Sequence, residues 1–226
     1  MHTRINYNQR FVFVGMTIAT FALLVPSFAN ADVMLGQMDT FQDGTTNNWM
    51  NSAGTYSLQD GGAGGSGDFY LQVVGYGGSG SGSRVAVHNS AQWTGNYTAA
   101  GVTGVELDMA NFGGTDLTMR FLLFSSAGLF TSLVPADVPA DGVWRTYMLG
   151  LLPGDLNQVG GGGTVQDALM DVQQLLIRHD TDGTQGIPGG TPVVGTLGID
   201  NIRAIPEPAS MLLLGMSGLG FMRRRS

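Results

Sequence analysis

Two carboxylates, Glu106 and Asp108, are spaced so that they could act together in acid–base chemistry. They alternate with Val105, Leu107 and Met109, and successive side chains of a β-strand point to opposite faces, so both carboxylates would lie on one face of a strand. A pair of carboxylates about 5 to 5.5 Å apart can hydrolyse a glycosidic bond with retention of configuration. The pattern therefore indicates either a catalytic strand or an acidic strand face in solvent.

The residue that follows this pair favours the second interpretation. The string Glu106-Leu107-Asp108-Met109-Ala110 is similar to the Glu-x-Asp-x-Glu strand of β-sandwich glycoside hydrolases of the laminarinase and lichenase type. The resemblance implies that the second glutamate completes the catalytic pair, and this chain has Ala110 at that position. We therefore expect the solvent face of a strand and no glycosidase activity.

Other catalytic arrangements lack the necessary residue types. His88 and His179 fall on different expected strands, and the chain has neither cysteine nor a Gly-x-Ser-x-Gly sequence. Neither a zinc site nor a nucleophile triad can be assembled from these residues. Two glycine-rich stretches, Gly61 to Gly67 and Gly75 to Ser83, lack the lysine and the following helix of a phosphate-binding loop, so we expect long hairpin loops there.

Aromatic side chains in loop-like segments are candidates for carbohydrate binding. Trp49, Trp93 and Tyr97 lie among Gly, Asn, Ser and Thr residues, where flat rings could stack on a sugar. Tryptophan in an all-β domain is also commonly a core residue, so both interpretations stay open for these three positions. Trp144 lies in an alternating apolar segment and is expected in the core.

The elements that must position these residues are short and mostly extended. Apolar alternation recurs between clusters of Gly, Asn, Asp and Ser, which is typical of strands joined by turns. The expected strands are Met34 to Phe41, Phe69 to Val74, Arg84 to His88, Val105 to Ala110, Leu117 to Phe124, Leu129 to Leu133, Trp144 to Leu149, Gln174 to His179 and Thr196 to Ile202. Thr164 and Asp167 have capping-box spacing, which predicts one short helix or turn ending at Met170. About nine strands predict an all-β fold, a jelly-roll-type β-sandwich.

The first and last expected strands carry a further resemblance. Phe41-Gln42-Asp43-Gly44-Thr45 with Trp49, and Leu197-Gly198-Ile199-Asp200-Asn201-Ile202, look like the terminal strands of carbohydrate-binding-module-type jelly rolls. That resemblance implies adjacent termini and, in many such domains, a structural calcium, here with Asp39, Asp43 and Asp200 as carboxylate ligands. The alternative is that Asp43-Gly44 is an ordinary turn and that Asp200 is an exposed partner of Arg203.

Residues 1–31 are expected to be a cleaved signal peptide. Arg4 and Arg10 flank a polar segment, Phe11 to Val25 is mostly apolar, and Ala29 and Ala31 have the small-x-small spacing that signal peptidase accepts. The apolar segment, about 15 residues, is short for a membrane anchor. Export is therefore favoured, with Asp32 as the mature N-terminus.

Residues 205–226 combine three features in order. Pro206, Glu207 and Pro208 break regular structure, an apolar run of 14 residues from Ala209 to Met222 follows, and Arg223, Arg224 and Arg225 come next. Clustered arginines favour a cytoplasmic end. These features resemble the PEP-CTERM sorting signal of Gram-negative, exopolysaccharide-producing bacteria; the alternative is a buried C-terminal helix. The resemblance implies an apolar helix held transiently in the inner membrane, and cleavage by an exosortase near the Pro-Glu-Pro sequence.

Residues 32–204 are expected to form a single domain. From Asp32 to Glu207 the chain has five arginines and all 17 acidic residues, a net charge of −12, which would repel nucleic acid. We therefore expect an exported cell-surface or matrix protein that associates with exopolysaccharide through a lectin-like sandwich, without a nucleic-acid partner. A purely structural biofilm or interaction protein, and an unrecognised polysaccharide-active enzyme, are the alternatives.

Overall fold

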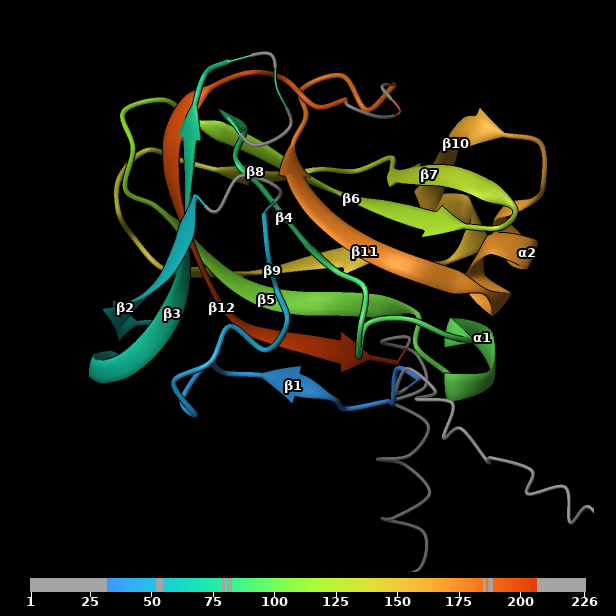
Figure 1. Ribbon diagram of the computed structural model, residues 1–226, viewed down its shortest axis with the longest axis horizontal. Helices are drawn as coiled ribbons and strands as arrows, with labels where there is room; N and C mark the ends of the chain where they lie inside the picture. The colour runs from blue at the N-terminus through green and yellow to red at the C-terminus, as the bar shows by residue number, and fades with distance from the viewer. Residues whose placement is uncertain are drawn as a thin grey trace, which may run out of the picture.

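The structure, a computed structural model, describes residues 32–51, 55–78, 80, 83–184, 186 and 189–206. These residues form two antiparallel sheets that pack face to face around one hydrophobic core (Figure 1). The helices in this part of the chain are α1 (Tyr97–Ala100), α2 (Val165–Met170) and a 3-10 turn at Pro153–Asp155. Within the described ranges, no helix has the length and apolar character needed to cross a membrane. The all-β class is confirmed; the expected signal helix and C-terminal helix lie outside the described residues.

The first sheet has β12 near its centre. Its strands are β1 (Met38–Asp39), β2 (Tyr56–Gly62), β3 (Gly65–Tyr76), β5 (Gly104–Asn111), β9 (Arg145–Gly150) and β12 (Val194–Ile205). The order is β2-β3-β12-β5-β9, and β1 pairs with the end of β12 that β3 does not reach. Because side chains alternate, Leu197 and Ile199 of β12 join the core while Gly198 and Asp200 face outward.

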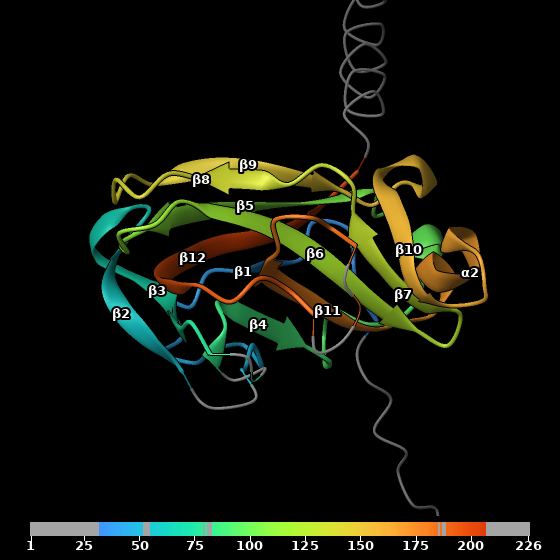
Figure 2. The same ribbon diagram turned by 90° about the horizontal axis from the view of Figure 1, so that it is seen from above.

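The second sheet closes the other side of the core. Its strands are β4 (Ala86–Asn89), β6 (Leu117–Ser125), β7 (Gly128–Ser132), β8 (Ala136–Val138), β10 (Leu156–Gly161) and β11 (Val172–His179). The order is β10-β7-β6-β11-β4, with β8 paired to β6. Figures 1 and 2 both place α1 and α2 at one end of the sandwich and the β2–β3 hairpin at the opposite end.

Most sequence-based expectations about the elements are confirmed, with changes at the boundaries. All nine expected strands are present, but β1 covers only two residues of the expected Met34 to Phe41. The capping box of α2 is confirmed, because the Thr164 hydroxyl accepts from the Asp167 amide at 3.1 Å. The glycine-rich stretch from Gly61 to Gly67 is a tight turn rather than a long loop: β2 continues to Gly62 and β3 begins at Gly65.

A bulge in β12 sets which residues of the last strand face the core. Pairing with β5 shifts between Asp200 and Arg203, and Asn201 has a φ of 51°, a left-handed conformation that asparagine tolerates better than most residues. The Asn201 side chain donates to Asp108 on β5 at 2.8 Å. This extra residue returns Ile202 to the core face while Asp200 stays on the outer face.

Candidate functional site

The three aromatic residues that are candidates for sugar binding lie in the core. Trp49, Trp93 and Tyr97 all have 0% exposed surface. The Trp49 and Trp93 rings pack against each other with centroids 5.9 Å apart, and the Tyr97 hydroxyl donates to the Trp93 carbonyl at 3.0 Å. A ring without exposed surface cannot stack on a sugar, so the binding interpretation is wrong for these positions and the core interpretation holds.

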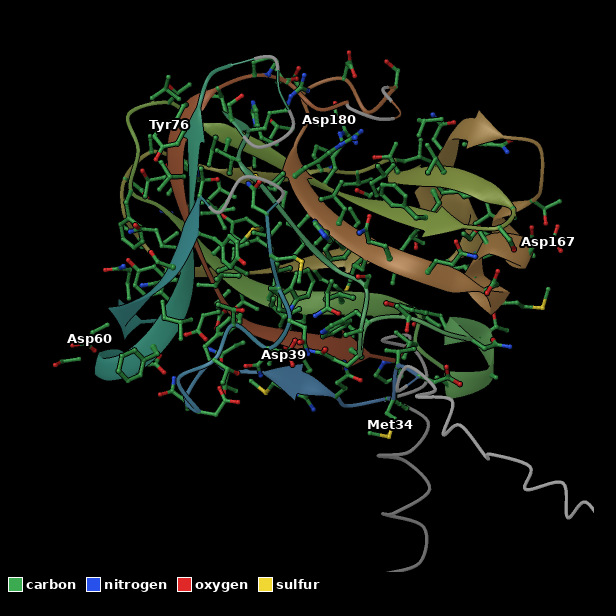
Figure 3. The ribbon with its side chains drawn as sticks, in the orientation of Figure 1. Met34, Asp39, Asp60, Tyr76, Asp167 and Asp180 are labelled. Carbon is green, nitrogen blue, oxygen red and sulfur yellow. The ribbon has the colours of Figure 1, made fainter. Side chains whose placement is uncertain are left out.

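Asp39 is the polar centre of this buried cluster. Its Oδ2 accepts hydrogen bonds from Trp49 Nε1 at 2.7 Å and Trp93 Nε1 at 2.6 Å, and from the Gln92 amide at 3.3 Å. Figure 3 shows Asp39 directed from β1 into the interior of the sandwich. Burial raises the pKa of Asp39, and the three donors partly oppose this rise by favouring the carboxylate. The side chain therefore joins the two-residue strand β1 to two loops that carry tryptophans.

The calcium site expected from Asp39, Asp43 and Asp200 is not formed by these residues. Asp39 pairs with Ile202, on the core side of the sheet, whereas Asp200 lies on the outer side. Asp43 is exposed, and its carboxylate accepts from the amide and hydroxyl of Thr45 in a local turn. Among the described residues, no three His, Cys, Asp or Glu side chains are grouped so that they could hold a metal ion. The three carboxylates therefore do not fit a calcium ion.

Asp200 has a different neighbour, Asp68 of β3. Asp200 has no exposed surface, so the alternative that it is an exposed partner of Arg203 is also wrong. Its carboxylate accepts from the amides of Ala63 at 3.1 Å and Asn201 at 2.7 Å. Burial is the main reason that the pKa of Asp200 is raised to about 7. Hydrogen bonds from the two amides oppose this rise, and the negative charge of Asp68 and contact with its carboxylate add smaller contributions to it.

The hairpin between β2 and β3 brings these two carboxylates together. A Cβ added to Gly62 would lie 2.7 Å from Asp200 Oδ2 and 2.8 Å from Asp68 Oδ2, so both oxygens lie against the backbone of this residue. Asp68 Oδ2 also accepts from the Gly64 amide at 2.5 Å. Only glycine leaves room here for both carboxylates, which explains part of the glycine-rich composition of this segment.

A cluster of three rings covers the outer face of the first sheet. The rings are Tyr70 of β3, Phe112 just after β5 and Trp144 just before β9, with centroids 5.2 to 5.8 Å apart. They pack over Gly198, where an added Cβ would lie 2.8 Å from both Phe112 and Trp144 and 3.1 Å from Tyr70. The small residue on the central strand thus lets rings from three other segments meet. We call Tyr70, Phe112 and Trp144 the aromatic platform.

The aromatic platform is partly accessible and has a fixed orientation. Phe112 is 42% exposed, Trp144 is half-buried and Tyr70 is 6% exposed. Trp144 Nε1 donates to the Gly61 carbonyl at 3.2 Å, which ties the indole to the β2–β3 hairpin. The expectation that Trp144 is a core residue is therefore wrong, because it lies on the solvent side of the sheet.

Polar side chains of the same outer face surround the aromatic platform. Gln72 donates to the Tyr70 hydroxyl at 3.4 Å, and Gln59 lies opposite Tyr70 in the β2–β3 pair. On the other side of β12, Asp108 accepts from the Thr146 hydroxyl at 2.6 Å. Amides, hydroxyls and a carboxylate beside accessible rings are the groups with which proteins bind polar, ring-shaped ligands.

Glu106 and Asp108, the two candidate catalytic carboxylates, have different neighbours on the outer face of the first sheet. Ala110, at the position of the missing glutamate, lies beside Gly198 in the pairing of β5 with β12. Asp108 is engaged by Thr146 and Asn201, while Glu106 lines a groove with Met148 and Arg203. His179 Nδ1 accepts from the Thr118 amide at 2.9 Å, and burial lowers the pKa of both His179 and His88.

The processing residues expected at both ends fall mostly outside the described chain. The residues outside the described ranges are Ala29, Ala31, Glu207, Pro208 and the three arginines at 223–225. Pro206 is the last described residue and is half-buried directly after β12.

Comparison with known proteins agrees with the interpretation of the C-terminal segment. Residues 204–226 match the model of the PEP-CTERM protein-sorting motif. The chain therefore carries this motif, which implies an exported protein that passes through the membrane and is processed by an exosortase. A search of curated proteins found no match.

Comparison with solved structures supports the jelly-roll fold of the body. An exo-β-agarase superposes with a TM-score of 0.54 at 15% identity, over 76% of this chain and 26% of the agarase chain. The family 11 carbohydrate-binding module from Clostridium thermocellum, in complex with a β-1,3-1,4-mixed-linked tetrasaccharide, superposes with a TM-score of 0.51 at 15% identity, over 76% of this chain and 96% of the module. The chain thus corresponds to about a quarter of the agarase and to nearly all of the binding module. At this identity the likeness shows the fold alone.

Proposed function

We propose that this is an exported cell-surface or extracellular-matrix protein whose β-sandwich associates with exopolysaccharide. The sorting motif at residues 204–226 supports the location, because such a tail holds the protein at the membrane until an exosortase releases it. The aromatic platform is the observation that carries the binding part of the proposal. Its exposed Phe112 edge and the surrounding amides and hydroxyls offer both the ring contacts and the hydrogen bonds that a sugar requires.

Loss of the exposed ring is expected to weaken polysaccharide binding. Phe112→Ala should lower the affinity by about fivefold or more, since one aromatic contact contributes on the order of 1 kcal/mol beyond its buried area. The measurement is affinity electrophoresis of the body, residues 32–206, in gels containing mixed-linked β-1,3-1,4-glucan or agar, after a glycan array has identified a ligand.

Phe69→Ala is the matched control for this experiment. Phe69 is the same residue type, is 40% exposed against 42% for Phe112, and its side chain alternates with Tyr70 to the other face of β3. The Phe69→Ala variant should bind the polysaccharide with the affinity of the unaltered protein. Equal losses in both variants, or no glycan bound by the unaltered body, would favour the alternative of a purely structural biofilm or interaction protein.

Changes in the tail are expected to block maturation without unfolding the body. Glu207→Ala, or deletion of Arg223 to Arg225, removes part of the sorting signal but no residue of the described sandwich. The variants should accumulate in the membrane, whereas the unaltered protein should be released without its C-terminal residues. Intact mass of the released protein is the measurement, and released protein that still contains Phe221 to Ser226 would contradict sorting.

A further inference from the structure

Large apolar side chains are exposed at the place where the folded body ends. Met34 is 67% exposed, Leu35 49%, Met38 46% and Met148 54%. We call these four residues the Met–Leu rim. Single exposed apolar residues are common on soluble proteins, but a group of them at one place marks a contact surface.

Two residues of the Met–Leu rim, Leu35 and Met148, line a groove at the end of β12. The groove has a volume of about 470 Å³, and its lining also includes Glu106, Arg203 and Pro206. Met38 lies opposite Arg203 in the pairing of β1 with β12. In Figure 3 the Met34 side chain points away from the body beside β1.

Backbone hydrogen bonds hold the rim to the last strand. The Gly36 amide donates to the Ala204 carbonyl, and the Ala204 amide donates to the Gln37 carbonyl, both at 2.9 Å. The rim therefore has a fixed position relative to Pro206, where the chain continues into the sorting segment.

The length of the sorting segment restricts how far the rim can be from a membrane. The apolar run starts at Ala209, only three residues after Pro206, so extended chain bridges at most roughly 10 Å between them. As a helix, its 14 residues would measure about 21 Å against a hydrocarbon core of about 30 Å. With Arg223 to Arg225 among the cytoplasmic headgroups, the remaining chain is too short to hold the body far from the outer surface of the membrane.

We propose that the Met–Leu rim contacts the outer interfacial layer of the inner membrane while the sorting segment is inserted. This inference rests on the sorting function proposed above and adds a lipid-facing surface on the folded body. The attraction to the membrane must come from apolar contact, because a body with many acidic residues is repelled by anionic headgroups. In the groove itself, Arg203 lies with Glu106, so both signs of charge are present there.

The absence of cysteine from the chain allows a direct test with single-cysteine variants. Met38→Cys and Met148→Cys report on the rim, Ser217→Cys on the sorting segment, and Val194→Cys is the control. Val194 is 68% exposed and begins β12, which ends at Ile205 beside the rim, so it lies about 35 Å away at the usual rise per residue.

Each variant of the mature chain, residues 32–226, is labelled with an environment-sensitive fluorophore and inserted into vesicles of phosphatidylethanolamine and phosphatidylglycerol. Spin-labelled lipids with a quencher near the headgroup report contact. The Ser217, Met38 and Met148 probes should be quenched at least about twofold more than the Val194 probe. Adding Met34→Ser and Leu35→Ser should reduce quenching at Met148 but not at Ser217.

Each other outcome has a distinct meaning. If the Ser217 probe is quenched but the rim probes are quenched no more than the Val194 probe, the lipid contact is overturned and sorting is left intact. No quenching at any probe would overturn both. Rim probes that are shielded from a water-soluble quencher but not reached by the lipid quencher would mean that a second copy of the chain covers the rim, which would also overturn the lipid contact.

Discussion

Replacing Asp39 with alanine is expected to lower the free energy of unfolding by about 3 to 6 kcal/mol, since each hydrogen bond to a buried charged group contributes about 1.5 to 3 kcal/mol. Two indole N–H groups, from Trp49 and Trp93, donate to the same Asp39 oxygen. Both rings have no exposed surface, so water cannot replace the lost acceptor. At about 2 to 4 °C per kcal/mol for a domain of this size, the melting temperature should fall by about 6 to 24 °C.

Thermal melting followed by tryptophan fluorescence measures this effect, with two control variants. Asp39→Asn keeps an oxygen that can accept from the indoles and should lose less than half as much stability. Asp43→Ala removes an exposed carboxylate four residues further along the chain and should change the free energy of unfolding by less than about 1 kcal/mol. If Asp39→Ala and Asp43→Ala have the same melting temperature, the buried acceptor does not stabilise the fold as proposed.

The same cluster shows why the sequence alone leaves open whether Trp49 and Trp93 are sugar-binding or core residues. Trp49 and Trp93 lie in segments with the composition of loops, and their burial depends on Asp39, which is 10 positions from the first and 54 from the second. No local pattern shows that a strand of two residues will provide an acceptor for both. Composition therefore predicts the loop backbone of these segments, but it does not decide whether their side chains are accessible.

The aromatic platform could not be found from the pattern for a related reason. Trp144 lies in an alternating apolar segment, which predicts a core position. The structure turns it outward because Gly198, on the central strand, leaves space on the outer face that the indole fills. The sequence places Gly198 in the last strand but does not show that Phe112 and Tyr70 lie across from it. Such neighbours follow from strand order, which a single sequence does not reveal.

Strand prediction succeeded where apolar alternation was strong and failed at short or glycine-containing strands. β5, with Val105, Leu107 and Met109, and β6 were found almost to the residue. β2, β8 and β10 were missed: β8 has three residues, and β2 and β10 each end in two glycines. Their pairing is determined by neighbouring strands more than by their own composition.

Asp200→Asn is expected to raise the melting temperature at pH 8 and to change it little at pH 4. Asp200 is fully buried on the outer side of β12, beside the carboxylate of Asp68. Burial, and then the charge of Asp68, raise the pKa of Asp200 to about 7, against an ordinary value of 3.8. Asparagine has nearly the same shape, carries no charge and can donate to Asp68.

The sign of the pH dependence follows from proton binding. Between pH 4 and pH 7 the folded protein holds a proton on Asp200 that the unfolded chain has lost, so stability falls as the pH rises through this range and is level above it. A difference of about three pKa units corresponds to a loss on the order of 4 kcal/mol above pH 7. The asparagine variant cannot ionise and should lack this part of the slope.

Melting temperatures of the body, residues 32–206, measured from pH 4 to pH 8 test this expectation. Asp137→Asn is the control, because Asp137 is an exposed carboxylate on β8 and its loss changes the net charge equally. The control should keep the slope of the unaltered protein, so that a flatter profile in Asp200→Asn reports the buried pair and not the overall charge. Equal slopes in all three proteins would mean that Asp200 is ionised throughout this range and that its burial does not raise its pKa.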